Sequence, residues 1–460
     1  MKRTLSLLVV GLLTAVFLLP LTSCGPAEIK GEISFASSRE PEVDAALIAG
    51  FTKLHPGVKV TRIQMEEDFP AQFAALAAAN KLPDVMYHYK LSSFATNGWL
   101  APLDKLLAND PDAKDILPVA LESGKYYGKQ YALPYFIQFN CLVVNKDLLE
   151  KNNADVPAYD WTIPQFDALL KKFTTNKTNG INHLWGFEWD LTPIIDNNVG
   201  WLTYKDRKYD FTNPAYLTSI GLVRGWKAAG YASDDLVAVK ATKPGFKNAY
   251  EEKFGVGVPA IDTGFTALGY IGTWDWGGWV RVLPFQKDLL PIPHPEGGKM
   301  ILPMQTDYLS IASSTKNMDA SYAFAKYLSF DPAGAQLTYE TYSKLPIEKQ
   351  SLLGPVTTNQ KVLDAFNAVK GYPDGFKWMV AHAKDSYVAD PQKRIPNWDR
   401  VFWEVAYPNL EKVQNGELNA ADVVQEITTK GNAALAEEFA KTDTIMAKVQ
   451  ADYDAAQTKK

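Results

Sequence analysis

Apolar residues in the first part of the chain alternate between strand-like and helix-like spacing. Glu32 to Ala36 and Val58 to Ile63 are short, largely apolar runs that predict strands. Between them, from Pro41 to Leu54, apolar residues recur three or four positions apart, which indicates one face of a helix. A strand, a helix and a second strand predict a βαβ unit, and hence an α/β fold with parallel strands.

The same alternation continues toward the C-terminus. The pattern predicts strands at 83–87 and 139–144, and helices at 73–80, 100–107, 320–328 and 420–439, with one more beginning after Thr162. The aromatic-rich region from Trp185 to Lys253 is expected to be irregular. There is no internal repeat, low-complexity tract or obvious linker, so the domains are expected to share the chain rather than follow one another along it.

The N-terminus has the features of a secretory signal. Two basic residues precede an apolar run from Leu5 to Leu19, which is too short to be a good membrane span. The sequence LTSC at residues 21–24 resembles a bacterial lipobox. That resemblance implies removal of residues 1–23 and lipid on the thiol and the new amino group of Cys24. A plain signal peptide and an uncleaved anchor helix are the alternatives.

Composition argues against several classes of function. The chain has 460 residues with 47 basic and 52 acidic side chains, a net charge of −5. A mildly acidic surface repels phosphate backbones, so no nucleic-acid partner is expected. Five scattered histidines and two cysteines do not predict a metal site. The sequence has no P-loop, HExxH or G-x-S-x-G motif, and no cofactor is expected.

The second cysteine, Cys141, lies in the apolar run 139–144 and is expected to be a buried thiol. If Cys24 is acylated, Cys141 has no partner for a disulfide. An exported chain of this length must then be stabilised by its hydrophobic core.

Several short segments, spread over almost the whole chain after the signal, stand in an order and spacing that one family shares. They are Pro56–Val60, Leu82–Val85, Leu133–Pro134, Val144–Leu149, Asp160–Thr162, Gly272–Trp276, Ile311–Ser314 and Ile395–Trp398. Together they resemble the family 1 extracellular solute-binding proteins of ATP-driven importers, the wider family that contains maltose-binding protein. The resemblance implies a two-lobed type II periplasmic-binding-protein fold of class α/β, with an interlobe hinge and a ligand cleft.

The resemblance also implies how the chain is divided. The N-terminal lobe would comprise residues 28–139 and 308–344, and the C-terminal lobe residues 140–307 and 345–460. Segments near 139–141, 307–308 and 345–346 would then cross between the lobes and form the hinge.

Two groups of candidate ligand-binding residues can be argued from the residues themselves. Arg39 and Glu40 follow the first strand, and α/β sheets bind ligands at the carboxyl ends of their strands; a solvated ion pair or a helix-start acid is the alternative. Trp274, Asp275 and Trp276 place flat rings beside a polar group, and sugar rings stack their apolar C–H faces on such rings. A core tryptophan with a hydrogen-bonded indole N–H is the alternative there.

Six further candidates are implied by the resemblance: His88, Tyr89, Tyr135, Gln138, Trp189 and Trp398. Gln138 stands where the maltose-binding pattern has a cleft acid, so its uncharged amide argues against maltose itself. A surface loop for His88 and the core for Trp189 are the competing interpretations. The pair Asp307-Tyr308 fits either a hinge or a ligand contact.

The expected function is that of a binding protein and not of an enzyme. The chain would be a monomeric, lipid-anchored component of an ABC importer on the extracytoplasmic side of the cell membrane. It would bind a carbohydrate, such as an oligosaccharide, and deliver it to the permease subunits. A non-sugar ligand on the same fold is one alternative. A secreted glycoside hydrolase is another, because such enzymes also combine an aromatic cleft with two carboxylates.

Overall fold

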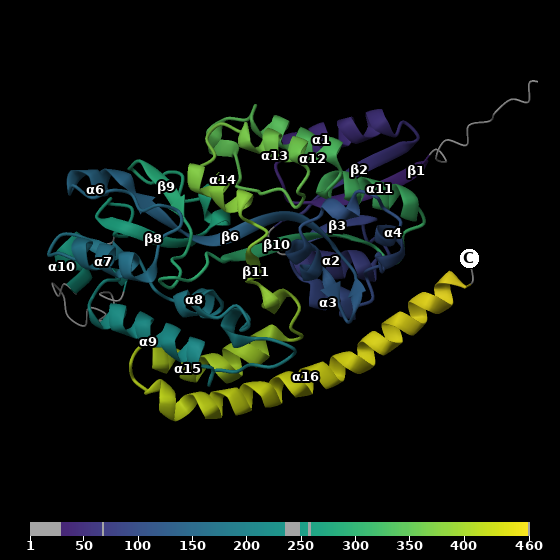
Figure 1. The fold of residues 1–460 in the computed structure, drawn as a ribbon. Helices are drawn as coiled ribbons and strands as arrows, with labels where there is room; N and C mark the ends of the chain where they lie inside the picture. Colours follow the sequence, from purple (N-terminus) through teal and green to yellow (C-terminus); the bar gives the residue numbers. More distant parts are fainter. Residues whose placement is uncertain (1–28, 67–68, 235–248, 256–258, 459–460) are drawn as a thin grey trace, which may run out of the picture.

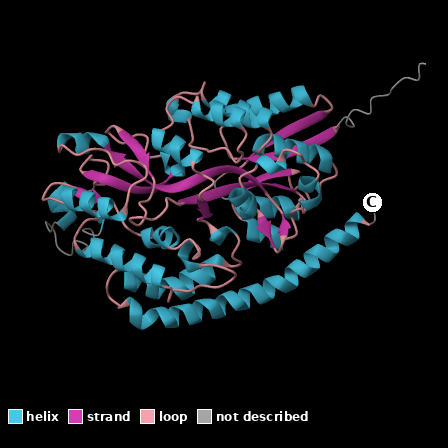
Figure 2. Cartoon of the chain, in the orientation of Figure 1, coloured by secondary structure: helices cyan, strands magenta, loops and turns pink. Residues whose placement is uncertain are grey.

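The fold is organised around one mixed β-sheet. The computed structural model describes residues 29–66, 69–234, 249–255 and 259–458, so the signal segment and Cys24 lie outside the described residues. Nine strands of the described chain form the sheet, in the order β2-β1-β3-β10-β6-β8-β7, with β11 beside β10 and β9 beside β6 (Figures 1 and 2). Their bounds are β1 Gly31–Ser37, β2 Val58–Gln64, β3 Val85–His88, β6 Leu133–Asn145, β7 Asn179–Ile181, β8 Thr266–Gly272, β9 Lys287–Leu290, β10 Leu302–Ile311 and β11 Ser386–Val388. The short strands β4 (Lys125–Tyr126) and β5 (Lys129–Gln130) form a separate hairpin.

Two long strands, β6 and β10, hold the sheet together. Residues 133–139 of β6 pair with β10, whose far end pairs with β3, whereas residues 140–145 pair with β8 and β9. The sheet therefore has a first half (β2, β1 and β3) and a second half (β8, β7 and β9), joined by β6 and β10. Both strands run through the middle of the molecule in Figure 1.

The predicted βαβ unit is confirmed. Strands β1 and β2 are parallel over seven residue pairs, and α1 (Pro41–Leu54) lies between them in the chain. Pro41 occupies the first turn of α1, where its missing N–H leaves no hydrogen bond unmade. The helix predicted after Thr162 is α7, Ile163–Phe173, and the Gln165 side chain accepts a bond of 2.8 Å from the Thr162 N–H.

Helices cover both faces of the sheet (Figure 2). Besides α1 and α7 they are α2 Phe69–Ala78, α3 Leu91–Thr96, α4 Asp104–Ala108, α5 Pro118–Ser123, α6 Lys146–Lys151, α8 Phe187–Ile195, α9 Pro214–Ala228, α10 Ala249–Phe254, α11 Met318–Ser329, α12 Pro332–Tyr342, α13 Gln360–Asn367, α14 Asp374–Ala381, α15 Tyr407–Gln414 and α16 Ala420–Gln457. Shorter turns are η1 Ala113–Asp115, η2 Trp201–Thr203, η4 Thr273–Gly277, η5 Ile347–Lys349 and η6 Pro391–Lys393, and η7 (Asp399–Ala406) is a π-helical segment. No helix of the described chain has the length and apolarity needed to cross a membrane.

The prediction that 185–253 is irregular is wrong for its described part. Helices α8 and α9 lie there, with η2 between them. Eight of the nine residues of α8 are buried, so the helix has no polar face and leaves no helical period in the sequence. The rest of this region, 235–248, lies outside the described residues.

The C-terminal helix is longer than the sequence pattern indicates. It was expected to end at Phe439, but α16 continues to Gln457 and runs along the lower edge of the molecule in Figure 1. Its first part packs on η7, whereas Met446 joins the core of the first half and Val449 lies beside Gly98 at the end of α3. Helix α16 thus reaches from one half of the protein to the other.

Three hydrophobic clusters make up most of the core. The largest packs β1, β3, β6 and β10 against α1, α11 and α12, and continues into α13 and α14. A second lies under α7, α8 and α9, and a third, rich in aromatic rings, lies between η2, η7 and α16. The expectation of a buried thiol is confirmed, because Cys141 is fully buried and free.

A buried carboxyl in α8 makes stability depend on pH. Burial raises the pKa of Glu188 to about 7, although the Gln414 amide donates to one oxygen. Its unfolded-state pKa is about 4.3. Between these values the unfolded chain binds fewer protons than the folded one, so Glu188 makes the fold less stable as pH rises from about 5 to 8. We expect Glu188→Gln to raise the melting temperature at pH 8 by a few degrees and to change it little at pH 5.

Thermal unfolding at both pH values measures this effect, with the exposed Glu426→Gln as the control. Burial also raises the pKa of Asp190, to about 6. Asp190 therefore makes every variant less stable as the pH rises, and this background is the same in all of them. An equal gain at pH 5 and pH 8 would show that Glu188 does not titrate in this range.

Candidate functional site

A pocket of about 420 Å³ lies where the first three strands end and β6 and β10 continue into the second half. It is bounded by the turn after β1, the end of β2, β3, the two long strands, the turn η4 and the segment before α13. The lining residues are Ser38, Arg39, Glu40, Pro41, Gln64, Tyr87, Phe136, Gln138, Trp274, Asp307, Ser351 and Leu353. The carboxyl ends of β1 and β3 therefore face this pocket, as expected for a parallel α/β unit.

Hydrogen bonds fix the wall formed by the β1–α1 turn. The Arg39 guanidinium donates to the Tyr135 hydroxyl and, at 3.2 Å, to the Tyr342 hydroxyl, and it lies 4.7 Å from the centre of the Tyr135 ring. Glu40 accepts from Tyr342 at 2.8 Å and from Ser351 at 2.7 Å. Arg39 is 7% exposed. This buried cation is thus held mainly by neutral hydroxyls, with Glu40 bound to the same tyrosine.

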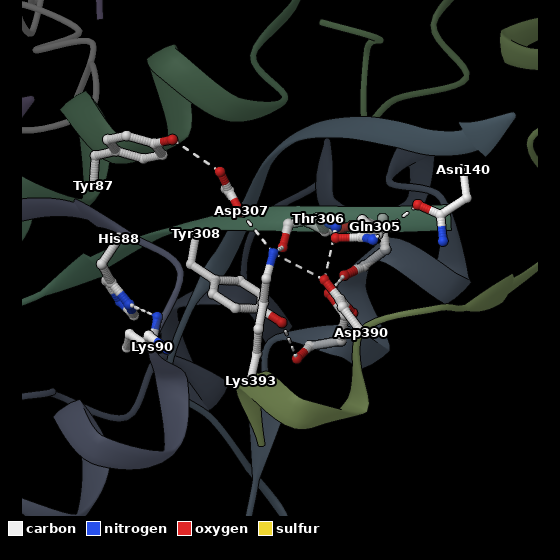
Figure 3. Close-up of polar contacts among 12 residues, drawn as sticks. Tyr87, His88, Lys90, Asn140, Gln305, Thr306, Asp307, Tyr308, Asp390 and Lys393 are labelled. Atoms are coloured by element: carbon white, nitrogen blue, oxygen red, sulfur yellow. Dashed lines mark hydrogen bonds and ion pairs between the residues drawn. The ribbon is translucent and has the colours of Figure 1, made fainter. Parts of the chain in front are cut away.

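A chain of polar contacts forms the floor of the pocket (Figure 3). The Tyr87 hydroxyl donates to Asp307 at 2.8 Å, and the other oxygen of Asp307 lies 2.6 Å from the Lys393 ammonium. Lys393 also contacts Asp390 at 2.9 Å and the backbone oxygen of Thr306 at 2.8 Å. Asp307 is thus held between a first-half tyrosine and a lysine of η6.

The opposite wall is Trp274, whose ring is 44% exposed. The turn η4 presents it. Asp275 accepts a bond of 2.9 Å from the Gly272 N–H and closes the turn, while Trp276 points into the core. The Trp274 ring lies against Gly272, where an added Cβ would stand 2.1 Å from ring carbon Cζ2. Glycine is therefore required at 272 for this position of the ring.

The eleven candidate residues do not all meet at this pocket. Arg39, Glu40, Gln138 and Trp274 line it, Tyr135 supports Arg39 from below, and Asp275 closes the turn. Tyr89 is half-buried with the Lys90 ammonium 5.5 Å from its ring. Trp276 and Trp189 are core residues, and Trp398 stacks on Phe402 at 4.5 Å beside Trp189.

His88 is placed in the core, on the other face of β3 from Tyr87. It is fully buried, stacks on Phe94 at 4.2 Å and contacts the Ser310 hydroxyl at 2.8 Å. Burial lowers its pKa to about 3, so the ring is neutral at physiological pH. Its neighbour Tyr87 points into the pocket instead, because successive strand residues face opposite sides.

Sequence reasoning missed several residues of the pocket. Gln64, Tyr87 and Phe136 were not singled out, and the alternation along β3 was the one available signal for Tyr87. Three more tryptophans, Trp185, Trp279 and Trp403, are over a third exposed, and like Trp274 they belong to the second half. No sequence pattern distinguishes them from the eight other tryptophans. No group of three potential metal ligands occurs among the described residues.

The chain matches the sequence profile of the bacterial extracellular solute-binding proteins over residues 36–335. It belongs to that family. It is also 22% identical to the maltotriose-binding protein of Pyrococcus abyssi over 353 residues, which are 71% of this chain and 68% of the relative.

Solved structures show the same fold. One is a substrate-binding protein of an ABC transporter from Listeria monocytogenes in complex with cycloalternan, with a TM-score of 0.63, 19% identity and coverage of 88% of this chain and 99% of that one. Another is the sugar-binding protein MalE from Xanthomonas citri, with a TM-score of 0.66, 18% identity and coverage of 88% and 98%. The predicted α/β binding-protein fold is therefore confirmed.

The contact between Gly272 and the Trp274 ring gives a testable prediction. We expect Gly272→Ala to push the ring away and to destabilise the fold by about 1–3 kcal/mol, as overpacking does. Gly277→Ala is the matched control in the same turn, because its Cβ would meet only the Ser351 hydroxyl, at 3.7 Å. Urea unfolding measures the stability of each variant. The fluorescence of Trp274 is identified as the part of the tryptophan emission that is lost in Trp274→Phe, and its quenching by iodide reports how exposed the ring is. Equal stability and equal quenching in the two variants would contradict this role of Gly272.

Proposed function

We propose that this protein binds an oligosaccharide in the pocket beside Trp274 and delivers it to the permease of an ABC importer. The observation that carries the proposal is an exposed tryptophan ring that faces a wall of polar side chains across the pocket. A sugar has the same two-sided character, since its ring faces are apolar and its edges carry hydroxyl groups. The ring would stack on Trp274 while hydroxyls bond to the opposite wall.

The polar wall offers both donors and acceptors. Arg39 and the Gln138 amide can donate to sugar oxygens, whereas Glu40 and Asp307 can accept from hydroxyls. Arg39, Glu40 and Asp307 are already oriented by their bonds to tyrosines and Lys393, so these three would lose little conformational entropy on binding. One relative is named for maltotriose, and one protein of the same fold was solved in complex with cycloalternan. Both ligands are sugars of this class.

More than one sugar ring is proposed because the aromatic surface extends beyond the pocket. Trp185 and Trp403 are nearly parallel, with ring centres 6.3 Å apart, and the Trp185 indole donates to the Tyr407 hydroxyl at 2.7 Å. The ring of His183 packs on Tyr270 of β8, with ring centres 5.5 Å apart, and β8 leads directly into the turn that carries Trp274. The chain leading to Trp185 therefore passes close to that turn. A longer ligand would reach these rings.

Two lobes would close over the ligand. The first would comprise residues 28–139 and 308–344, and the second residues 140–307 and 345–460. The crossing segments would be β6 near residue 139, β10 near 307 and the chain near 345. A ligand that touches both lobes favours the closed state by its difference in affinity for the two states.

We further propose that lipid on Cys24 holds the monomer at the extracytoplasmic face of the membrane, since two or three acyl chains suffice for stable attachment.

The first test is the affinity for neutral oligosaccharides, with maltotriose as the first probe. We expect Trp274→Ala to weaken binding by about 2–4 kcal/mol in isothermal titration calorimetry, as for a central aromatic contact. Phe265→Ala is the control, because Phe265 is exposed to the same extent, 43%, but does not line the pocket. Normal affinity together with a much lower melting temperature would make Trp274 a structural residue and contradict the site.

The same mixtures separate the rival functions. Chromatography after long incubation should return the oligosaccharides intact. Shortened products would instead support a glycoside hydrolase. Binding of amino acids or polyols, with no affinity for any sugar of a broad panel, would support a non-sugar ligand.

Attachment is tested with Cys24→Ala in a bacterial host. The wild-type protein should sediment with membranes and take up labelled palmitate. The variant should be released as a soluble protein or remain as an unprocessed precursor. A correctly processed Cys24→Ala protein that stays on the membrane would rule out the lipid anchor.

A further inference from the structure

A second pocket, of about 500 Å³, lies on the other face of β10. Tyr87 faces the pocket beside Trp274, whereas His88 faces the opposite side, where it pairs with Tyr308. The Tyr308 hydroxyl donates to the backbone of Ser123 in α5, at 3.1 Å, and Glu122 of the same helix lines the second pocket. The two pockets therefore flank the crossing strands from opposite faces.

Elements from both halves of the protein form this second pocket. The hairpin β4–β5 contributes Tyr126 and Tyr127, and the loop after α8 contributes Trp201 and Arg207. The segment around η6 and the helix α16, through Phe439, complete the lining. A ligand in this pocket would thus touch both halves.

The second pocket is strongly cationic in an acidic chain. Lys125, Lys205, Arg207 and Arg394 line it together with a single acid, Glu122. Lys125 pairs with Glu122 at 2.6 Å, and Arg207 pairs with Asp443 at 2.9 Å.

Arg394 differs from the other cations of this pocket. Its guanidinium makes no hydrogen bond or ion pair within the described chain, and its Nε atom is buried without a partner there. A partly buried cation without a counter-ion lowers stability, so an anion supplied by a ligand would be favoured.

The aromatic part of the second pocket is rigid. The Arg207 guanidinium lies 4.5 Å from the ring centres of both Tyr127 and Phe439. The Trp201 indole donates to the buried Asp190 at 2.8 Å, which fixes its ring.

Backbone strain is concentrated in the loop after Trp201. Its members Leu202, Thr203, Asp206 and Arg207 have φ values of 52°, 60°, 50° and 64°. Left-handed conformations of non-glycine residues raise the energy of the fold, and such strain gathers at ligand sites.

We propose that this second pocket binds a sugar ring that carries a negative charge, either a carboxylate or a phosphate. The anionic group would pair with Arg394, and the ring would lie among Trp201, Tyr126 and Tyr127. A neutral sugar could use the aromatic rings but would leave Arg394 without a counter-ion. An anionic sugar would thus prefer the second pocket, and a neutral sugar the pocket beside Trp274.

Occupancy of the second pocket also affects the first. A rotation about β6 and β10 that narrows the pocket beside Trp274 must widen the one on the opposite face. An anion that bridges both halves in the second pocket therefore opposes closure, and by linkage it lowers the affinity for a ligand that requires closure. This coupling rests on the proposed sugar-binding function, whereas anion binding itself does not.

Calorimetric titration in phosphate-free buffer tests the second pocket with glucuronic acid, glucose 6-phosphate and glucose. We expect at least one of the two anions to bind, and the tighter of them shows whether the pocket prefers a carboxylate or a phosphate. Glucose should bind at least tenfold more weakly. Arg394→Gln should lower the anion affinity about tenfold or more, and Arg394→Lys should lower it less. Arg281→Gln is the control, since Arg281 is also half-buried but does not line the pocket. Lys125→Gln, which removes another positive charge from the lining of the same pocket, provides a second variant should Arg394→Gln fail to fold, and it is expected to lower the anion affinity by a smaller factor.

Equal affinity for glucose and the anions would overturn the proposal, as would anion binding that survives Arg394→Gln or Lys125→Gln unchanged. The coupling is measured as maltotriose affinity with and without saturating anion, and a severalfold decrease is expected. Unchanged maltotriose affinity would remove the coupling. Absence of any maltotriose binding would count against the proposed function and leave the anion result to stand by itself.

Discussion

The pairing of β6 with β10 is the interaction on which the rest of the structure depends. These strands are the only members of the described sheet that belong to both halves, and their antiparallel ladder runs from Met304 opposite Phe139 to Leu309 opposite Leu133. The register shifts between Asp307, which lies opposite Phe136, and Tyr308, which lies opposite Pro134, so Tyr135 is the extra residue of β6 at this point. A ladder of main-chain hydrogen bonds keeps its register while it twists. It can therefore hold two halves of a protein together and still permit rotation between them.

Buried charges surround these strands and fix the elements that leave them. Asp190 accepts hydrogen bonds from Asn140, Trp201, Tyr270 and Tyr387, which come from β6, η2, β8 and β11. Near the other end of β10, Lys393 joins η6 to the strand through Asp307 and Asp390. Loss of an acid beside Lys393 would leave an uncompensated buried charge, and loss of a donor to Asp190 would leave a buried carboxyl with fewer hydrogen bonds; both changes are destabilising. These groups thus specify one arrangement of loops around a strand pair that by itself would allow several.

The two pockets have different chemistry because different elements line them. The pocket beside Trp274 combines one exposed indole with the Gln138 amide and with carboxylate and guanidinium groups that are already hydrogen-bonded. The pocket on the opposite face combines several aromatic rings with an excess of cations. The long helix α16 contacts both halves and closes only the second pocket. The two proposed ligands, a neutral sugar and an anionic one, would therefore bind on opposite faces of the crossing strands.

The sequence by itself determined the local elements and the family. Short apolar runs revealed β1 and β2, and helical periodicity revealed α1 and α7, which each bury one face. Periodicity missed α8, which is buried almost all round and has no such contrast. It placed Arg39 and Trp274 at a ligand site from strand order and turn chemistry, and the structure brings them to one pocket. Only the tertiary structure decided that Tyr87 and not His88 faces that pocket, and that Trp189 lies in the core while Trp185 is exposed. The physical reason is that the burial and orientation of a side chain depend on which distant segments of the chain pack against it, and the residues next to it in the sequence do not determine that packing.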